Sequence, residues 1–172
     1  MKIAFILYDQ FTALDLVGPY EVIARWPGSE VHFVATRPAP VRADAGLVVL
    51  PTGTLDSLTD PDLVVVPGSG NPMPALNDKA LLAWVRHVSQ HATWMASVCT
   101  GASIYAAAGI HSPSLSGLPL EARTLRSARV SFTRRDVRRR ASQRDPLSSA
   151  GRMPLIQEAV HGAAECCLAP PP

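Results

Sequence analysis

A single cysteine, Cys99, lies in the segment SVCTG at residues 97–101, where an apolar run gives way to small residues. Gly101 and the small side chains after it permit a sharp, strained strand-to-helix turn, the nucleophile elbow on which a side chain stands exposed. Backbone N–H groups and the dipole at a helix start stabilise a thiolate, so the segment predicts a nucleophile with a pKa below that of a free thiol. The alternative is a buried structural cysteine, the usual environment of this residue type.

Asp15 lies in the apolar stretch ALDLV, at the beginning of a predicted helix. A carboxyl group in such surroundings can meet the thiol and transfer a proton. The alternative is an ordinary acidic residue, which the dipole favours near a helix start. Glu21, the other acid nearby, is expected to be solvated.

The loop PGSGN at residues 67–71 follows another apolar run. Backbone N–H groups near Gly68 and Ser69 could bind a negative charge that develops during a reaction. The alternative is a plain loop that ends a strand. A phosphate site is not indicated, because no Lys-Ser/Thr pair follows the loop.

The first 111 residues alternate short apolar runs with segments of helical periodicity. The expected strands are residues 3–8, 30–35, 63–66 and 93–98, with residues 46–50 as the arm of a hairpin. The expected helices are residues 12–26, 77–90 and 100–108, and Asn77 is expected to cap the second. This alternation predicts an α/β fold with a parallel sheet and helices on both faces. Sites in such sheets form beyond the carboxyl ends of the strands, where the three candidate segments emerge.

Composition changes near residue 111. Residues 1–111 hold 6 basic and 9 acidic residues, a net charge of −3, whereas residues 112–172 hold 10 and 5, a net charge of +5. Every basic residue of the second part is Arg, and Ile, Val and Leu fall from 29 of 111 residues to 11 of 61. The second part therefore lacks the apolar residues for a continuing core. We expect one domain at residues 1–111 and an Arg/Pro-rich tail at residues 112–172 that is disordered or comes from a shifted reading frame.

Several kinds of site and partner are disfavoured. No run approaches the roughly 18 apolar residues of a membrane span, and no signal peptide is visible. The three cysteines form no disulfide framework, so we expect a cytoplasmic protein with reduced thiols. His87 and His91 are four residues apart on a helix but have no third ligand, so no metal is expected. The arginines of the tail lack interleaved aromatic residues, which argues against a nucleic-acid partner.

Three motifs together resemble the DJ-1/PfpI superfamily, and within it the isonitrile hydratase branch. They are DQFTALDLVGPYEV at residues 9–22, VVPG at residues 65–68 and SVCTG at residues 97–101. The resemblance covers about residues 2–110. It implies a flavodoxin-like fold of the class I glutamine amidotransferase kind, in which helices flank a parallel sheet.

The resemblance also implies a reaction. Cys99 would attack the carbon of an isonitrile and Asp15 would supply or take the proton, so that water adds to give an N-substituted formamide. Thr100, with backbone N–H groups near Gly68, Ser69 and Thr100, would complete the pocket. No cofactor is expected, and the expected partners are a small-molecule substrate and a second copy in a homodimer.

Two departures from the family pattern concern the pocket and the tail. Gly68 is followed by Ser69 where the family usually has a second glycine. The Thr-His-Trp stretch that the family places after the cysteine is absent, since residues 118–120 read LPL. We therefore expect the C-terminal part of the fold to be missing or non-native. That loss would leave an edge and one apolar face of the sheet exposed, and would give an unstable, poorly soluble product with little or no activity.

Three functions stay open at this point. The first is a cysteine-dependent hydratase or a related hydrolase. The second is a regulatory module, because similar domains precede helix-turn-helix regions in some transcription regulators, although no such region is recognisable after residue 111. The third is a deglycase or stress-response member of the superfamily, in which the acidic position generally holds Glu rather than Asp.

Overall fold

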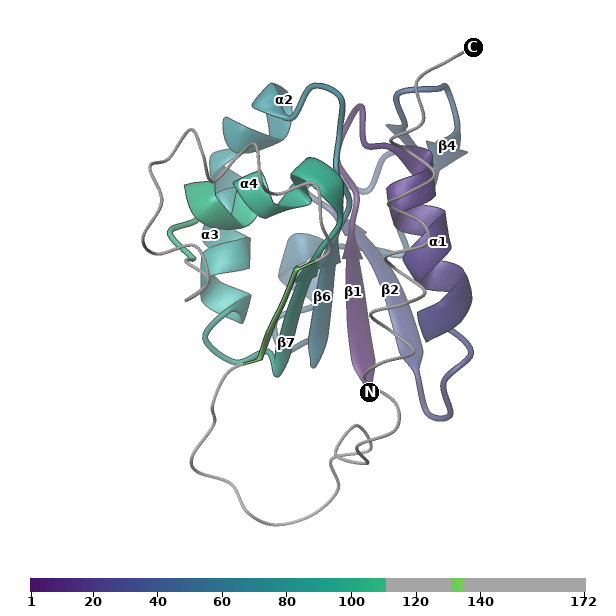
Figure 1. The fold of residues 1–172 in the computed structure, drawn as a ribbon, viewed down its shortest axis with the longest axis vertical. Coiled ribbons are helices and arrows are strands. Elements are labelled where there is room, and N and C mark those ends of the chain that lie inside the picture. The colour runs from purple at the N-terminus through teal and green to yellow at the C-terminus, as the bar shows by residue number, and fades with distance from the viewer. Residues whose placement is uncertain (111–130, 135–172) are drawn as a thin grey trace.

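A sheet of six strands forms the centre of the structure (Figure 1). The computed structural model describes residues 1–110 and the backbone of residues 131–134. Across the sheet the strands follow the order β5 (Gly53–Thr54), β2 (Glu30–Ala35), β1 (Lys2–Ile6), β6 (Leu63–Val66), β7 (Trp94–Ser97) and β8 (Ser131–Arg134). The first five strands are parallel, which confirms the predicted α/β sheet, whereas β8 is antiparallel to β7.

The chain starts in the middle of this sheet. From β1 it moves to one side, through β2 to β5, and then crosses to the other side of β1 to form β6 and β7. The direction of winding therefore reverses between β1 and β6. In α/β sheets such a switch point leaves a crevice outside the carboxyl ends of the two strands, where ligands bind.

Helices flank the sheet, as predicted. α1 (Ala13–Ile23) lies apart from a group formed by α2 (Met73–Leu76), α3 (Lys79–Val88) and α4 (Ala102–Ala107) (Figure 1). The predicted helices are present but shorter than expected. The one expected at residues 100–108 begins with a separate 3-10 turn, Cys99–Gly101, before α4.

The start of α3 corrects one expectation. Asn77 does not cap this helix. The Asp78 carboxylate accepts hydrogen bonds from the backbone N–H groups of Ala80 and Leu81, at 3.0 and 3.1 Å. A carboxylate in this position satisfies two of the donors that every helix start leaves free.

The core lies around β1 and β6, whose side chains are buried on both faces. Burial on both faces is typical of parallel strands covered by helices, and it explains the continuous apolar runs in the sequence. α3 packs onto this core through a face with helical spacing, formed by Leu81, Trp84, Val85 and Val88. The Trp84 indole N–H donates to the carbonyl of Leu58 at 2.9 Å, so the buried ring is also satisfied as a donor.

The hairpin arm expected at residues 46–50 is also present. β4 (Val48–Val49) pairs antiparallel with β3 (Val41–Arg42). The hairpin is tied to the loop before α1, because Gln10 N–H donates to the Arg42 carbonyl and the Thr12 hydroxyl donates to the Asp44 carboxylate, each at 2.8 Å. These contacts position the first turn of α1. The short elements β5, η1 (Leu55–Ser57) and α2 are too brief to produce a periodic signal, and the sequence analysis missed them.

The described part of the tail adds one strand to the sheet. β8 pairs with β7 from Trp94 opposite Arg134 to Ser97 opposite Ser131, so β8 forms the edge of the sheet on this side. The edge groups of β7 therefore have a ladder partner. The other expectations for residues 112–172, including disorder and a shifted frame, lie outside the described residues. Among the helices of the described residues, none is long and apolar enough to cross a membrane.

Candidate active site

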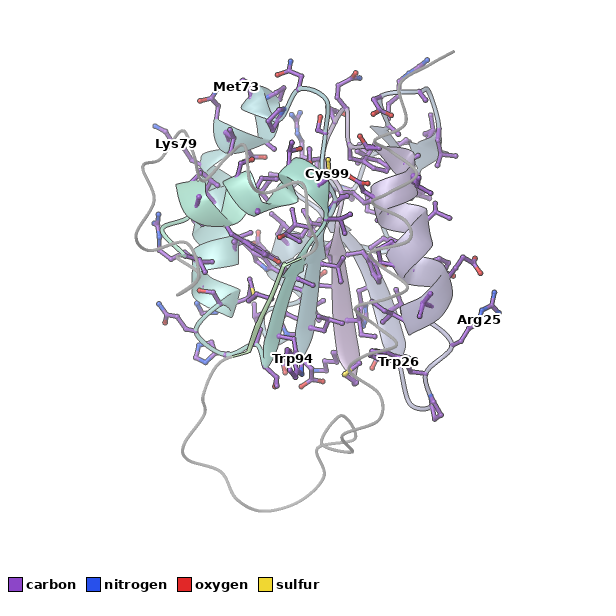
Figure 2. The ribbon with its side chains drawn as sticks, in the orientation of Figure 1. Arg25, Trp26, Met73, Lys79, Trp94 and Cys99 are labelled. Carbon is purple, nitrogen blue, oxygen red and sulfur yellow. The ribbon has the colours of Figure 1, made fainter. Side chains whose placement is uncertain are left out.

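Cys99 begins the turn between β7 and α4, with its backbone in the left-handed region at φ 54°. Residues other than glycine rarely adopt this conformation, which costs about 1 kcal/mol or more. Hydrogen bonds from Val98 N–H to the Val66 carbonyl, at 3.0 Å, and from Gly101 N–H to the Val98 carbonyl, at 2.9 Å, hold the turn. Figure 2 shows the Cys99 side chain beyond the carboxyl ends of the strands, between α4 and α1. The backbone thus has the strained turn that SVCTG predicts.

Gly101 allows this turn to pack against the end of β6. A Cβ atom at Gly101 would lie 2.4 Å from the carbonyl oxygen of Val66 and 2.8 Å from that of Pro67. Both atoms are backbone and cannot retreat without disturbing β6. Glycine two residues after the cysteine is therefore a steric requirement of the turn.

The backbone of Gly68 is the point where the acid and the thiol meet. A Cβ atom at Gly68 would lie 2.7 Å from Asp15 Oδ2, 2.7 Å from Cys99 Cβ and 2.8 Å from the backbone nitrogen of Thr100. Asp15 comes after β1, Gly68 comes after β6, and Cys99 and Thr100 come after β7; these three strands end side by side in the sheet. The fold therefore brings the three predicted segments together at the switch point.

Asp15 is a buried carboxyl group with 0% exposure. Its Oδ2 atom accepts a hydrogen bond from Gly68 N–H at 3.0 Å, and Thr12 N–H donates to the Gly68 carbonyl at 2.8 Å. A carboxyl group without solvent is a costly feature that hydrogen bonds must offset, and such groups concentrate at functional sites. Its burial distinguishes Asp15 from an ordinary helix-start charge.

The pKa of Cys99 differs from the sequence-based expectation. Partial burial of the thiol and the facing charge of Asp15 raise the pKa of Cys99 above the usual value, and these effects outweigh the hydrogen bonds from the Thr100 backbone and side chain that lower it. The expected lowering by a helix start was wrong for a structural reason. α4 has only 6 residues and begins after a 3-10 turn, so few peptide dipoles align behind the sulfur.

The backbone donors expected to bind a developing charge are mostly engaged within the site. Gly68 N–H donates to Asp15, and Ser69 N–H donates to the Thr100 hydroxyl at 2.8 Å. The Thr100 hydroxyl in turn donates to the Ser69 carbonyl at 2.8 Å. The Thr100 hydroxyl carries one proton, so it can donate either to the Cys99 sulfur or to the Ser69 carbonyl, but not fully to both. Of the three expected N–H donors, that of Thr100 is the one directed to the sulfur.

Ser69 connects the loop after β6 to the loop after β1 through a hydrogen bond. Ser69 is buried, and its hydroxyl donates to the Gln10 carbonyl at 2.6 Å and accepts from Asn71 N–H at 3.0 Å. Gln10 itself has a positive φ of 68°, so this bond holds a strained residue of the loop after β1. The serine that departs from the family pattern therefore has a structural role, which the sequence analysis did not identify.

Tyr8 is a further residue of this region that the sequence analysis missed. Its ring is buried, and its hydroxyl donates to the Pro67 carbonyl at 2.7 Å. Burial raises the pKa of Tyr8, and the charges of Asp15, Cys99 and Asp44 raise it further, so the hydroxyl stays a donor. The signal that could have found it was a tyrosine placed directly after a buried strand. A buried phenol needs a hydrogen-bond partner, so such a residue is expected to contact a neighbouring loop.

The two histidines of α3 and the turn after it lie against each other. The rings of His87 and His91 pack edge to face with centroids 5.4 Å apart. Within residues 1–110, no three His, Cys, Asp or Glu side chains are grouped so as to hold a metal ion.

The sequence model of the DJ-1/PfpI family matches residues 1–143. The chain belongs to the DJ-1/PfpI family. The matched region continues past residue 110, where the resemblance of the motifs was expected to end.

Individual relatives match a little under two thirds of the chain. An isonitrile hydratase of Pseudomonas putida is 36% identical over 110 residues, which cover 64% of this chain and 48% of that protein. An uncharacterized protein in the cpoL 5' region of Streptomyces lividans is 32% identical over 114 residues, which cover 63% of this chain and 80% of that protein. This DJ-1/PfpI chain thus spans less than half the length of the hydratase.

A solved structure supports the fold. A THiJ/PfpI family protein from Pseudomonas syringae superposes with a TM-score of 0.61 at 33% identity, over 63% of this chain and 46% of that one. The parallel sheet flanked by helices is therefore that of the DJ-1/PfpI family, as the three motifs predict.

Proposed function

We propose that the site formed by Cys99 and Asp15 adds water to isonitriles and releases N-substituted formamides. The observation that carries this proposal is the meeting of a half-buried thiol on a strained turn with a fully buried carboxyl group, at the backbone of Gly68. The similarity to the isonitrile hydratase of Pseudomonas putida supplies the substrate class. Because the chain spans 48% of that hydratase, the activity is proposed for the site that residues 1–110 contain.

The first step of the proposed reaction is addition of the thiol. The carbon of an isonitrile can accept both a nucleophile and a proton. The sulfur of Cys99 forms a bond to this carbon, and the thiol proton passes through Asp15 to the same carbon, which gives a thioimidate, R–N=CH–S. Asp15 leaves the step in the protonation state in which it entered.

Water completes the reaction. As the water oxygen bonds to the thioimidate carbon, Asp15 carries one water proton to the nitrogen. The carbon–sulfur bond then breaks, the product leaves as R–NH–CHO, and the second water proton returns to the sulfur. Nothing is oxidised or reduced in this sequence, so it requires no redox cofactor.

The neighbouring residues have supporting roles in this proposal. Gly68 N–H orients the Asp15 carboxyl group, and Thr100 N–H stabilises negative charge on the sulfur. Ser69 holds the Thr100 side chain through its backbone N–H and carbonyl.

The homodimer expected from the resemblance stays a prediction, for which analytical ultracentrifugation is the measurement.

The test is turnover of a simple alkyl isonitrile by the purified 172-residue chain. The isonitrile stretch should disappear from the infrared spectrum as the formamide appears by mass spectrometry. Cys99→Ser should abolish turnover, whereas the double substitution Cys166→Ser/Cys167→Ser should preserve it. An α-oxoaldehyde assayed in parallel represents the deglycase alternative. Turnover of the aldehyde alone, or isonitrile turnover that survives Cys99→Ser, would contradict the proposal.

A further inference from the structure

We propose that Tyr8 is a positioning residue of this site: through the peptide unit that joins Pro67 to Gly68, its hydroxyl sets the hydrogen bond that holds Asp15 beside Cys99. This inference deepens the proposed function and rests on it for the role of Asp15 in turnover. The contacts that carry it do not involve a substrate, so it can be tested without one.

The two ends of one peptide unit carry the two hydrogen bonds. The Pro67 carbonyl accepts from the Tyr8 hydroxyl at 2.7 Å, and Gly68 N–H donates to Asp15 Oδ2 at 3.0 Å. Both bonds are buried. The atoms O=C–N–H of a peptide unit lie in one plane and share electrons. A donor on the oxygen therefore draws density from the nitrogen and strengthens the N–H as a donor.

The same peptide unit lies between the two reactive groups. The Cβ position of Gly68 is 2.7 Å from both Asp15 Oδ2 and Cys99 Cβ, and that of Gly101 is 2.8 Å from the Pro67 carbonyl oxygen. A rotation of this peptide would thus move the acid relative to the thiol and press on the elbow turn. The Tyr8 hydroxyl opposes such a rotation by fixing the oxygen end.

Packing alone does not account for the hydroxyl. A phenylalanine at position 8 would fill the same space, yet the buried Tyr8 ring carries a hydroxyl group that reaches the loop after β6. Its charged neighbours are those of the site, namely Asp15, Cys99 and Asp44. Tyr105 provides a contrast, because its buried hydroxyl donates to the carbonyls of Ala96 and Val64, within β7 and β6.

The experiment measures how the alkylation rate of Cys99 by iodoacetamide depends on pH. Tyr8→Phe removes the donor on the Pro67 carbonyl and weakens the bond from Gly68 to Asp15, so the carboxyl group is held less closely beside the thiol. Its charge then opposes the Cys99 thiolate less. Because the Asp15 charge raises the pKa of Cys99, we expect the alkylation midpoint to fall and Cys99 to be alkylated faster below it.

Two controls separate this effect from general loosening of the fold. Tyr105→Phe deletes an equally buried phenol hydroxyl outside the site and should leave the midpoint unchanged. In an Asp15→Asn background, Tyr8→Phe should produce no further shift in the midpoint, because the peptide unit between Pro67 and Gly68 would have no carboxylate charge to position. Equal shifts in Tyr8→Phe and Tyr105→Phe, or a shift that persists in the Asp15→Asn background, would overturn the proposal.

A second variant covers the case in which Tyr8→Phe does not fold. Site-specific replacement of Tyr8 by a ring-fluorinated tyrosine keeps the shape and makes the hydroxyl a stronger donor, so the midpoint should rise instead. A midpoint that matches the unmodified chain would overturn the proposal. If the unmodified chain turns over no isonitrile, the proposed function fails, whereas the alkylation midpoints still decide the role of Tyr8.

Discussion

Asp15→Asn should change the reactivity of Cys99 and the turnover of the site in opposite directions. The substitution keeps the size of the side chain and an oxygen that can accept from Gly68 N–H. It removes the negative charge that faces the thiol and the proton that the proposed mechanism transfers. The charge raises the pKa of Cys99 in the native chain, so its loss should lower that pKa.

The size of this effect follows from the geometry at Gly68. Asp15 Oδ2 and Cys99 Cβ each lie 2.7 Å from the same point, so they are at most 5.4 Å apart. The thiolate charge lies on the sulfur, one bond beyond Cβ, and two unit charges about 7 Å apart at an effective dielectric constant of about 20 repel by about 2 kcal/mol. The thiol is partly exposed, and solvent screening reduces the effect of this repulsion to about a tenfold change in the thiolate population below the midpoint.

Iodoacetamide labelling of the peptide that contains Cys99, followed by mass spectrometry over a pH series, measures the midpoint. Below the midpoint, Asp15→Asn should be labelled about tenfold faster, because thiolate is the reactive form. Isonitrile turnover should fall by roughly 100-fold or more, the usual contribution of a positioned proton carrier. Asp9→Asn, which removes an exposed carboxylate before α1, should change neither quantity. An unchanged or raised midpoint would refute the electrostatic reasoning, and unchanged turnover would leave Asp15 as a structural residue.

Three further predictions concern the loop, the core and the tail. Gly68→Ala should abolish turnover and lower the melting temperature, whereas Gly70→Ala should do neither, because a Cβ at Gly68 would lie under 3 Å from three groups of the site and one at Gly70 meets nothing within 4 Å. The free energy of unfolding should fall as pH rises above about 10, by about 2.7 kcal/mol per pH unit, because Tyr8 and Tyr105 have raised pKa values, stay protonated in the native chain and ionise on unfolding. Urea titrations across that range measure the slope, and Tyr105→Phe should halve it; a slope that Tyr105→Phe leaves intact would be inconsistent with this assignment. Downstream of codon 110, another reading frame of the gene should encode a Thr-His-Trp stretch and apolar, Gly/Ala-rich segments. If neither alternative frame is open and the 172-residue protein melts cooperatively, the shifted-frame hypothesis is wrong.

The elements that local pattern controls were predictable from the sequence. The strands at residues 30–35 and 63–66 have the bounds that the sequence predicts, because β-branched and aromatic runs bounded by turn residues favour extended backbone. The elbow at Cys99 was equally predictable, since the small residues around it are what a sharp turn requires. The order of β1, α1 and β2, followed by β6, α3 and β7, was enough to place the three candidate segments at one edge of the sheet.

The electrostatics of the site were decided by tertiary structure. The lowered pKa expected for Cys99 followed from its own turn, whereas the raised pKa follows from burial and from Asp15, which another loop contributes. Gly68 and Asp15 are 53 residues apart in the chain, and Ser69 and Thr100 are 31 apart, so no local pattern could show that their donors are already engaged. Tyr8 escaped notice for the same reason, since its partner Pro67 lies 59 residues away. Sequence pattern determines which residues can do chemistry because backbone preferences are local. Only the folded chain decides their charge states and hydrogen-bond partners, because desolvation and electrostatic interactions depend on distance in space.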